Sequence, residues 1–430
     1  MRSKHSFRPV VEGLEDRWVP ATIRLVAGNL FVSNQVGELT VSTTGTAGQI
    51  TVNDFFNATD HKVTLSGVGS LISITGTNLA NKINFVADVA GGKLAFPGNL
   101  LINSGNGIDT VDLTGRIGGN VTLLTGLGND IVTSTGDLSI GGGLTFSDGF
   151  GLNTVNLNDQ DWIIGGNLTM SGVGTFNSGT GNMLKVGGAV TLAATPTVAN
   201  PLNVTFNAGS LVDIGKSLTI TGSAVTDSVQ VLSLLSVGGN MSVNLRGGLN
   251  TFFLTPTTGG TGINGSLFYI GNGDADTVFL GDFSDVAGNT SIEMGGGANV
   301  FVDNPLSLYA GNLTVNGGND TNTFVISGAV SGNLGVSLGN GDNNLTQVNG
   351  AIGGRFSYRL GNGSNAALNL APAAGTTVVI DAVFGTGSST FSLLTDFTLT
   401  GIVRGTGGSY TFDQGTATLA PTLYFINYPV

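Results

Sequence analysis

Residues 118–132 read GGNVTLLTGLGNDIV, and the same kind of stretch recurs along most of the chain. Each copy has a glycine-anchored run in which apolar and polar residues alternate, and a second alternating run follows after glycine and asparagine. The residue after the anchoring glycine recurs about every 23 residues, at positions 99, 120, 143, 167, 189, 217, 240, 266, 289, 312, 333 and 355. Self-similarity at a fixed period indicates a repeat architecture.

The alternating runs have the period of β-strands. In residues 155–157 and 168–170 a polar residue separates two apolar ones, so one face of each strand is apolar. Such short strands become stable when each repeat stacks on the next and buries a continuous apolar column. We therefore predict an all-β fold, a single-stranded parallel β-helix of about 23 residues per coil. The crossover rule favours right-handed coiling. A β-propeller is the alternative, but its blades need about 40 residues.

At about 4.8 Å per coil, roughly 17 coils would make a rod about 80 Å long. We predict a leader over residues 1–22, first coils and an N-terminal cap over 23–97, a regular solenoid over 98–415 and a C-terminal cap over 416–430. The aromatic residues of 423–428 suit a cap that blocks edge pairing. The step from 189 to 217 is long and contains Pro196 and Pro201, which predicts a protruding loop.

Composition limits the classes of partner. The chain has 430 residues, a net charge of −12, no cysteine, and only 10% charged residues. Nothing basic is clustered in the body to neutralise phosphates, so we predict no nucleic-acid partner. No apolar run approaches the ~18–20 residues that span a bilayer, so we predict no transmembrane segment.

Residues 7–22, FRPVVEGLEDRWVPAT, resemble the N-terminal segment that begins many planctomycete surface and secreted proteins. The resemblance rests on residues 14–17, LEDR, and on Pro20 and Ala21, and it departs from the usual pattern at residues 18–21. It implies export or display at the cell surface. The segment lacks the apolar core of a classical signal peptide, so a disordered basic leader is the alternative.

Two stretches, residues 105–111 and 126–132, are similar to the calcium-binding nonapeptide of hemolysin-type repeats, and residues 271–276 are a looser version. The resemblance makes Asp109, Asp130, Asp274 and Asp276 candidate calcium ligands. Calcium needs six to eight oxygens, several of them anionic, and here the motif never occurs in tandem.

The same corner position is mostly uncharged along the chain, which favours a structural ladder of stacked side chains over a metal site, and we predict no other cofactor. The residues of this predicted ladder are Asp109, Asp130, Asn153, Asn182, Asn250, Asp276, Asn299, Asn322, Asn344, Asn365, Ser389 and Ser409.

The sequence shows no group of residues typical of a catalytic site, and we predict no enzyme activity. The only histidines are His5 and His61, and no two aspartates are adjacent. Arg116, Arg246, Arg355, Arg359 and Arg404 are expected to lie far apart, and only Arg355 and Arg359 share a repeat. With Tyr358, these two are expected on a solvated face. Trp162 is expected at a strand end. Three or more carboxylates or basic groups that converge in one groove would favour a polysaccharide-processing protein instead.

These observations predict an exported structural or adhesion protein at the cell surface or outside the cell. Threonine, asparagine and serine on the outward faces would give a weakly charged, hydrogen-bonding surface for an envelope protein or a carbohydrate. The alternatives are a calcium-binding repeat module and a polysaccharide-binding or polysaccharide-processing β-helix.

Overall fold

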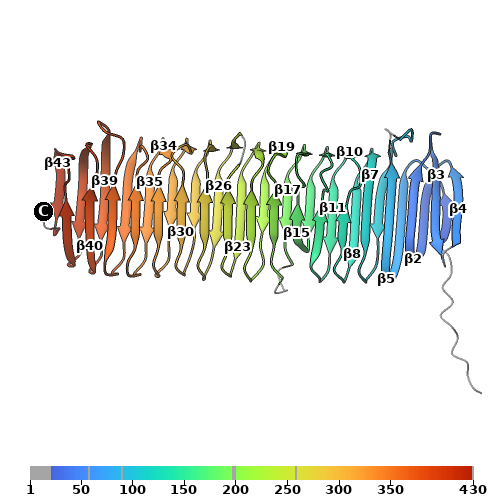
Figure 1. Cartoon of the computed structure of the whole chain (residues 1–430), viewed down its shortest axis with the longest axis horizontal. Helices are drawn as coiled ribbons and strands as arrows, with labels where there is room; N and C mark the ends of the chain where they lie inside the picture. The colour runs from blue at the N-terminus through green and yellow to red at the C-terminus, as the bar shows by residue number, and fades with distance from the viewer. Residues whose placement is uncertain (1–20, 57–58, 89–90, 196–199, 257–258, 429–430) are drawn as a thin grey trace, which may run out of the picture.

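The computed structural model describes residues 21–56, 59–88, 91–195, 200–256 and 259–428. These residues form 43 strands and no helix, and the strands follow one another along a long rod (Figure 1). Parallel pairing joins most strands to the equivalent strands of the turns before and after. The predicted parallel β-solenoid is therefore confirmed, with about 14 turns of about 23 residues. Most of the predicted leader, residues 1–20, lies outside the described residues.

Three faces surround the core. The first face consists of β6 (Asn99–Asn103), β8 (Val121–Gly126), β11 (Leu144–Asp148), β14 (Leu168–Ser171), β17 (Val190–Ala193), β20 (Leu218–Thr221), β23 (Met241–Arg246), β26 (Leu267–Gly271), β29 (Thr290–Glu293), β32 (Leu313–Asn316), β35 (Leu334–Leu338), β37 (Arg355–Leu360), β39 (Thr377–Phe384), β41 (Thr398–Gly405) and β43 (Thr418–Ile426).

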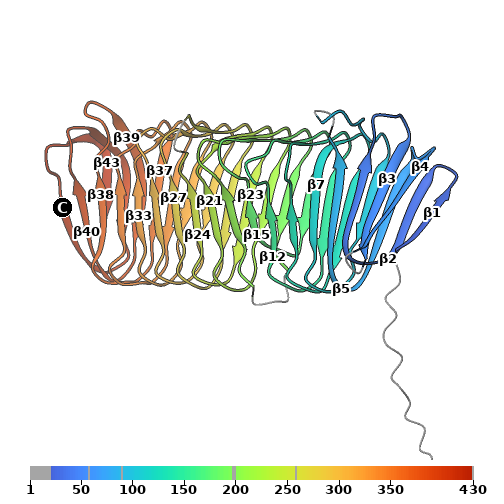
Figure 2. The same ribbon diagram turned by 45° about the vertical axis from the view of Figure 1, so that its right-hand side comes forward.

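The second face runs beside it along the whole rod (Figure 2). It consists of β7 (Thr110–Ile117), β9 (Ile131–Thr133), β12 (Asn153–Asn156), β15 (Val173–Asn177), β18 (Asn203–Phe206), β21 (Ser228–Val231), β24 (Thr251–Leu254), β27 (Thr277–Leu280), β30 (Val300–Asp303), β33 (Thr323–Ile326), β36 (Leu345–Val348), β38 (Ala366–Leu370), β40 (Ser388–Leu393) and β42 (Ser409–Asp413).

A third, shorter face was not predicted, because only two alternating runs per repeat are evident in the sequence. It consists of β10 (Leu138–Ile140), β13 (Trp162–Ile164), β16 (Met183–Val186), β19 (Leu211–Ile214), β22 (Leu234–Val237), β25 (Thr261–Ile263), β28 (Ser284–Val286), β31 (Leu308–Tyr309) and β34 (Ala329–Val330). Strands of two to four residues flanked by glycine have too short an alternation to stand out from turns.

The N-terminal end is built differently. There β1 (Thr22–Val26), β2 (Asn29–Thr43), β3 (Gln49–Phe56) and β4 (Thr59–Ser66) pair antiparallel in sequence order. The long β5 (Leu71–Ala87) pairs parallel with β2 and then with both β6 and β7, so it connects this end to the regular coils. Long strands and hairpins use more residues than a coil, which explains why the number of turns is smaller than the roughly 17 expected from an even ~4.8 Å stack.

The core is one continuous apolar column, because alternate residues of every regular strand point inward. Trp162 is the first residue of β13, at a strand end as expected, and its side chain is fully buried in this column. Tyr358 is also fully buried, so the expectation that it lies on a solvated face is wrong. At the C-terminal end the rings of Tyr410 and Tyr428 stack at 4.6 Å, and those of Phe412 and Phe425 lie 5.1 Å apart. This aromatic group covers the last coil of the column.

Candidate functional site

The corner that leads into the second face holds the predicted ladder of aspartate and asparagine. The backbone N–H of Asp109 donates to Oδ1 of Asp130 at 2.7 Å, and the N–H of Asp130 donates to Oδ1 of Asn153 at 2.9 Å. Further along, the N–H of Asn322 donates to Oδ1 of Asn344 at 2.8 Å. Each side chain therefore satisfies a buried backbone donor of the preceding coil, and these hydrogen bonds confirm a structural ladder.

Two members of the ladder were missed. Asn81 donates its N–H to Oδ1 of Asp109 at 2.8 Å, and Asp227 donates its N–H to Oδ1 of Asn250 at 2.9 Å. Asn81 lies in the long β5, and Asp227 follows the irregular 28-residue step, so neither falls where an even period would place it.

Two predicted members of the ladder are wrong. Asn182 directly precedes β16 on the third face, where its Nδ2 donates to the carbonyl of Gln160 at 2.9 Å. Asn365 is exposed and lies one residue before the register position that follows Asn344, and its N–H donates to Oγ of Ser388.

The four candidate calcium ligands lie in two separate places. Asp109 and Asp130 occupy adjacent coils near the N-terminal end, and both side chains are buried. Asp276 is buried six coils further along, whereas Asp274 is exposed and accepts a hydrogen bond from the N–H of Gly248 at 2.9 Å. Within the described part of the chain, no three acidic or histidine side chains are grouped so that they could hold a metal ion.

Burial raises the pKa values of the carboxyls at this corner. Burial, with a smaller contribution from the nearby charge of Asp109, raises the pKa of Asp130 to about 6. Asp148, on the strand that faces the same corner, has a pKa raised to about 7 by burial and by the charges of Asp130 and Asp109. Burial likewise raises the pKa of Asp276 to about 7. These groups therefore favour the protonated form in the folded state.

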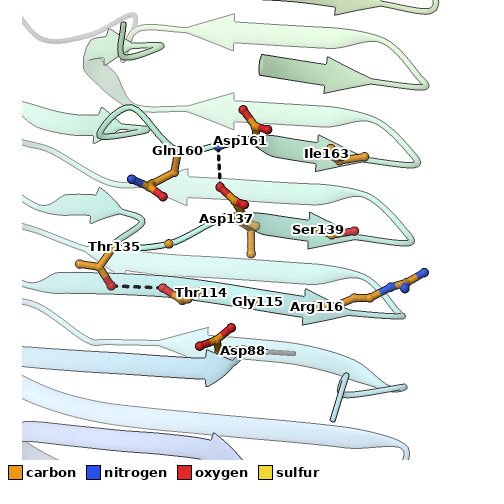
Figure 3. A pocket seen from close by; sticks show the side chains of 12 residues that line it. Asp88, Thr114, Gly115, Arg116, Thr135, Asp137, Ser139, Gln160, Asp161 and Ile163 are labelled. Carbon is orange, nitrogen blue, oxygen red and sulfur yellow. Dashed lines mark hydrogen bonds between the residues drawn. The ribbon is translucent and has the colours of Figure 1, made fainter. Parts of the chain in front are cut away.

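A groove on the outside of the rod gathers polar side chains that the sequence repeat does not mark (Figure 3). It lies where the second face turns into the third, and its volume is about 680 Å³. Its lining includes Asp88, Arg116, Asp137, Gln160 and Asp161. Three aspartates and one arginine thus line one groove, but they are spread over successive coils, and no three acidic side chains of the described residues are grouped together.

Backbone contacts fix the two central carboxylates of the groove. Oδ1 of Asp137 accepts the N–H of Asp161 at 3.2 Å, and Oδ1 of Asp161 accepts the N–H of Met183 at 2.8 Å. Asp137 and Asp161 lie one above the other on successive coils (Figure 3). Each carboxylate keeps a second oxygen that is not used in these two contacts, so the pair presents acceptors at a fixed spacing.

The arginines of the C-terminal coils are closer together than the sequence suggested. Arg359 and Arg404 lie two coils apart and both bind Asp381 on the coil between them, with N–O distances of 3.2 and 2.7 Å. Burial alone would raise the pKa of Asp381, but the two guanidiniums lower it below its ordinary value. The expectation that these arginines are far apart is therefore wrong for this pair, which joins three coils on the first face.

No helix in the described residues is long and apolar enough to cross a membrane. Comparison with known proteins gave no matching family model, no matching curated protein and no matching solved structure.

Proposed function

We propose that this chain is a non-enzymatic structural or adhesion protein, exported or displayed at the cell surface, whose outward faces contact an envelope carbohydrate or protein. The observation that supports this function is a row of hydroxyl side chains on the first face. Thr145, Thr169, Thr191 and Thr219 are in register on consecutive strands. The row continues to Thr122 at one end and Ser242 at the other.

The row points away from the core. Each of these residues lies between two buried neighbours on its own strand, so its side chain is on the outer side of the sheet. Parallel strands of adjacent coils are about 4.8 Å apart, so the hydroxyls repeat at that spacing along the rod. Uncharged groups that both donate and accept hydrogen bonds at a regular spacing suit a repetitive partner such as a polysaccharide or a layer of identical protein subunits.

The location and the binding can be tested separately. An antibody against the rod should label intact, unpermeabilised cells of the source organism. Labelling only after permeabilisation would contradict the proposed location. The purified rod should also sediment with isolated cell-envelope material, and failure to sediment would contradict adhesion.

A matched pair of variants tests the role of the hydroxyl row. Thr169→Lys with Thr191→Lys places two charges side by side on the first face. Thr205→Lys with Gln230→Lys does the same on the second face, on paired strands. Threonine also suits strands on structural grounds, so both variants should be compared for melting temperature first. We expect only the first pair to reduce sedimentation with the envelope, and an equal loss in both would contradict the role of this row.

A further inference from the structure

The geometry points to the groove lined by Asp88, Arg116, Asp137, Gln160 and Asp161 as a binding site for a short stretch of saccharide that carries no acidic groups. This inference goes beyond the proposed function, because it concerns a different part of the surface from the hydroxyl row. Its size is suitable, since small-molecule sites commonly have volumes of about 300–1,000 Å³.

The chemistry of the lining matches a polyol. Carboxylates accept hydrogen bonds, the guanidinium of Arg116 donates them, and the amide of Gln160 does both. The hydroxyl group of Ser139 adds a further donor and acceptor, whereas that of Thr135 already donates to Oδ2 of Asp112 at 2.7 Å. A saccharide presents adjacent hydroxyls that need donors and acceptors side by side, whereas a simple cation would need only oxygen ligands.

The charge of the lining excludes the acidic saccharides. Three aspartates and one arginine give the groove a net negative charge, within a chain whose net charge is −12. A uronic acid or a phosphate would meet like charges at short range, which is unfavourable. The side chain of Ile163 is 39% exposed and also lines the groove, so it offers an apolar contact for the C–H face of a sugar ring.

The direction of the groove also suits a chain-like ligand. Its residues come from four successive coils, since Ala87 pairs with Gly115, Gly115 with Leu138, and Leu138 with Trp162. Polar groups from these coils are therefore arranged along the rod axis.

Isothermal titration calorimetry with the whole chain tests this inference with three probes: cellohexaose, a chitosan hexamer and a galacturonan hexamer. We expect the neutral and the amino-bearing probes to bind and the acidic probe not to bind. Preferential binding of the galacturonan hexamer, or no binding of any probe at millimolar concentration, would overturn the inference.

Substitutions in the groove test whether the probe binds there. Arg116→Ala removes a donor, and Asp161→Asn removes the charge but keeps an acceptor for the N–H of Met183. Each should weaken binding by about tenfold or more, the loss expected for a hydrogen bond to a charged group. Asp285→Asn, on the same face at β28 and outside the groove, is the matched control and should bind as the unchanged chain does.

Unchanged affinity in both groove variants would place the ligand elsewhere and refute this site. Circular dichroism melting of all three variants shows whether each one folds. The result is independent of the envelope experiment, because a rod that fails to sediment with envelopes can still bind a soluble oligosaccharide in its groove. Conversely, cleavage of a bound probe would support the groove as a saccharide site and contradict the non-enzymatic function.

Discussion

The ladder has two adjacent acids near one end, Asp109 and Asp130, and three adjacent amides further along, Asn299, Asn322 and Asn344. Between them, the acids Asp227 and Asp276 alternate with the amide Asn250. Asp109 and Asp130 occupy the position that Asn322 and Asn344 occupy about nine coils later, and all four make or accept the same hydrogen bond between coils. The amide stretch also has contacts that acids cannot make. Nδ2 of Asn299 donates to Oδ1 of Asn322 at 3.0 Å, and Nδ2 of Asn322 donates to Oδ1 of Asn344 at 3.2 Å.

The difference shows that the backbone contact requires an oxygen, not a charge. Asparagine supplies the oxygen at every pH and uses its NH₂ group to continue the ladder. Aspartate supplies the oxygen too, but burial favours its protonated form, and its neighbours on adjacent coils repel it when it ionises. The acidic end of the ladder should therefore respond to pH, and the amide stretch should not.

The comparison can be reversed by placing an acid in the amide stretch. Asn322→Asp should lower the free energy of unfolding by roughly 3 kcal/mol at pH 8, because it buries a charge beside acceptors with no cation to balance it. The loss should be smaller at pH 5, where the new carboxyl holds its proton. Denaturant titration at both pH values measures this. The control is Asn369→Asp on β38, whose outward side chain should change stability by less than about 0.5 kcal/mol.

The amide stretch can also be broken by removing the acceptor. Asn344→Leu leaves the backbone N–H of Asn322 without its acceptor. Nδ2 of Asn322 loses one acceptor but keeps the carbonyls of Gly318 and Asp320. One unsatisfied buried donor should cost roughly 1–3 kcal/mol. The midpoint of guanidinium denaturation gives this value. A loss no larger than that of Asn369→Leu would mean that the ladder contributes little to stability.

The acidic end predicts how the unchanged chain responds to pH. The pKa values of Asp130 and Asp148 are about 6 and 7 in the folded state, above their ordinary 3.8. The folded state thus holds protons that the unfolded chain has lost, and this stabilisation is complete below pH 3.8 and disappears as the pH rises through 6 to 7. The denaturation midpoint should be lower at pH 8 than at pH 5.

A neutral variant sharpens this prediction. Asp148→Asn should stabilise the chain at pH 8 by on the order of 1 kcal/mol, with part of the effect screened by solvent, and should reduce the pH dependence. Denaturant titration of the variant at pH 5 and pH 8 measures both effects. An identical pH dependence in the variant and the unchanged chain would contradict the assignment to this corner.

The smallest expected effect concerns calcium. A ladder that works through hydrogen bonds needs no cation, so the melting temperature should be the same in calcium chloride and in an excess of chelator. A calcium-dependent rise that Asp130→Asn abolishes would instead support the calcium-binding alternative.

The period and the alternation of the repeat predicted the stacked strands, because both follow directly from the inward and outward positions of residues such as Leu168 and Thr169. The third face could not be predicted in the same way. Its strands have two to four residues, and Trp162 stands there among residues that resemble turns. The ladder was predictable over much of its length. It was missed at Asn81 and Asp227 and wrongly extended to Asn182 and Asn365, because corners of other faces and an exposed neighbouring position carry the same residue types.

The groove could not be predicted from local sequence. Asp88, Arg116, Asp137 and Asp161 belong to no shared motif, and their separations along the chain are unequal. They meet because Ala87, Gly115, Leu138 and Trp162 are in register, which only the pairing of whole coils reveals. Arg359 and Arg404 illustrate the same point, since the residue that joins them lies on the coil between.

The direction of the backbone hydrogen bonds has a mechanical consequence. They run along the rod, so tension between its two ends acts on the bonds between coils rather than on the covalent chain within a coil. The outermost coil has neighbours on one side only and should detach first. Each detachment would release about 23 residues, or roughly 75 Å of extended chain. In a single-molecule stretching experiment the rod should unfold one coil at a time and lengthen in regular steps. A single abrupt rupture would contradict this behaviour.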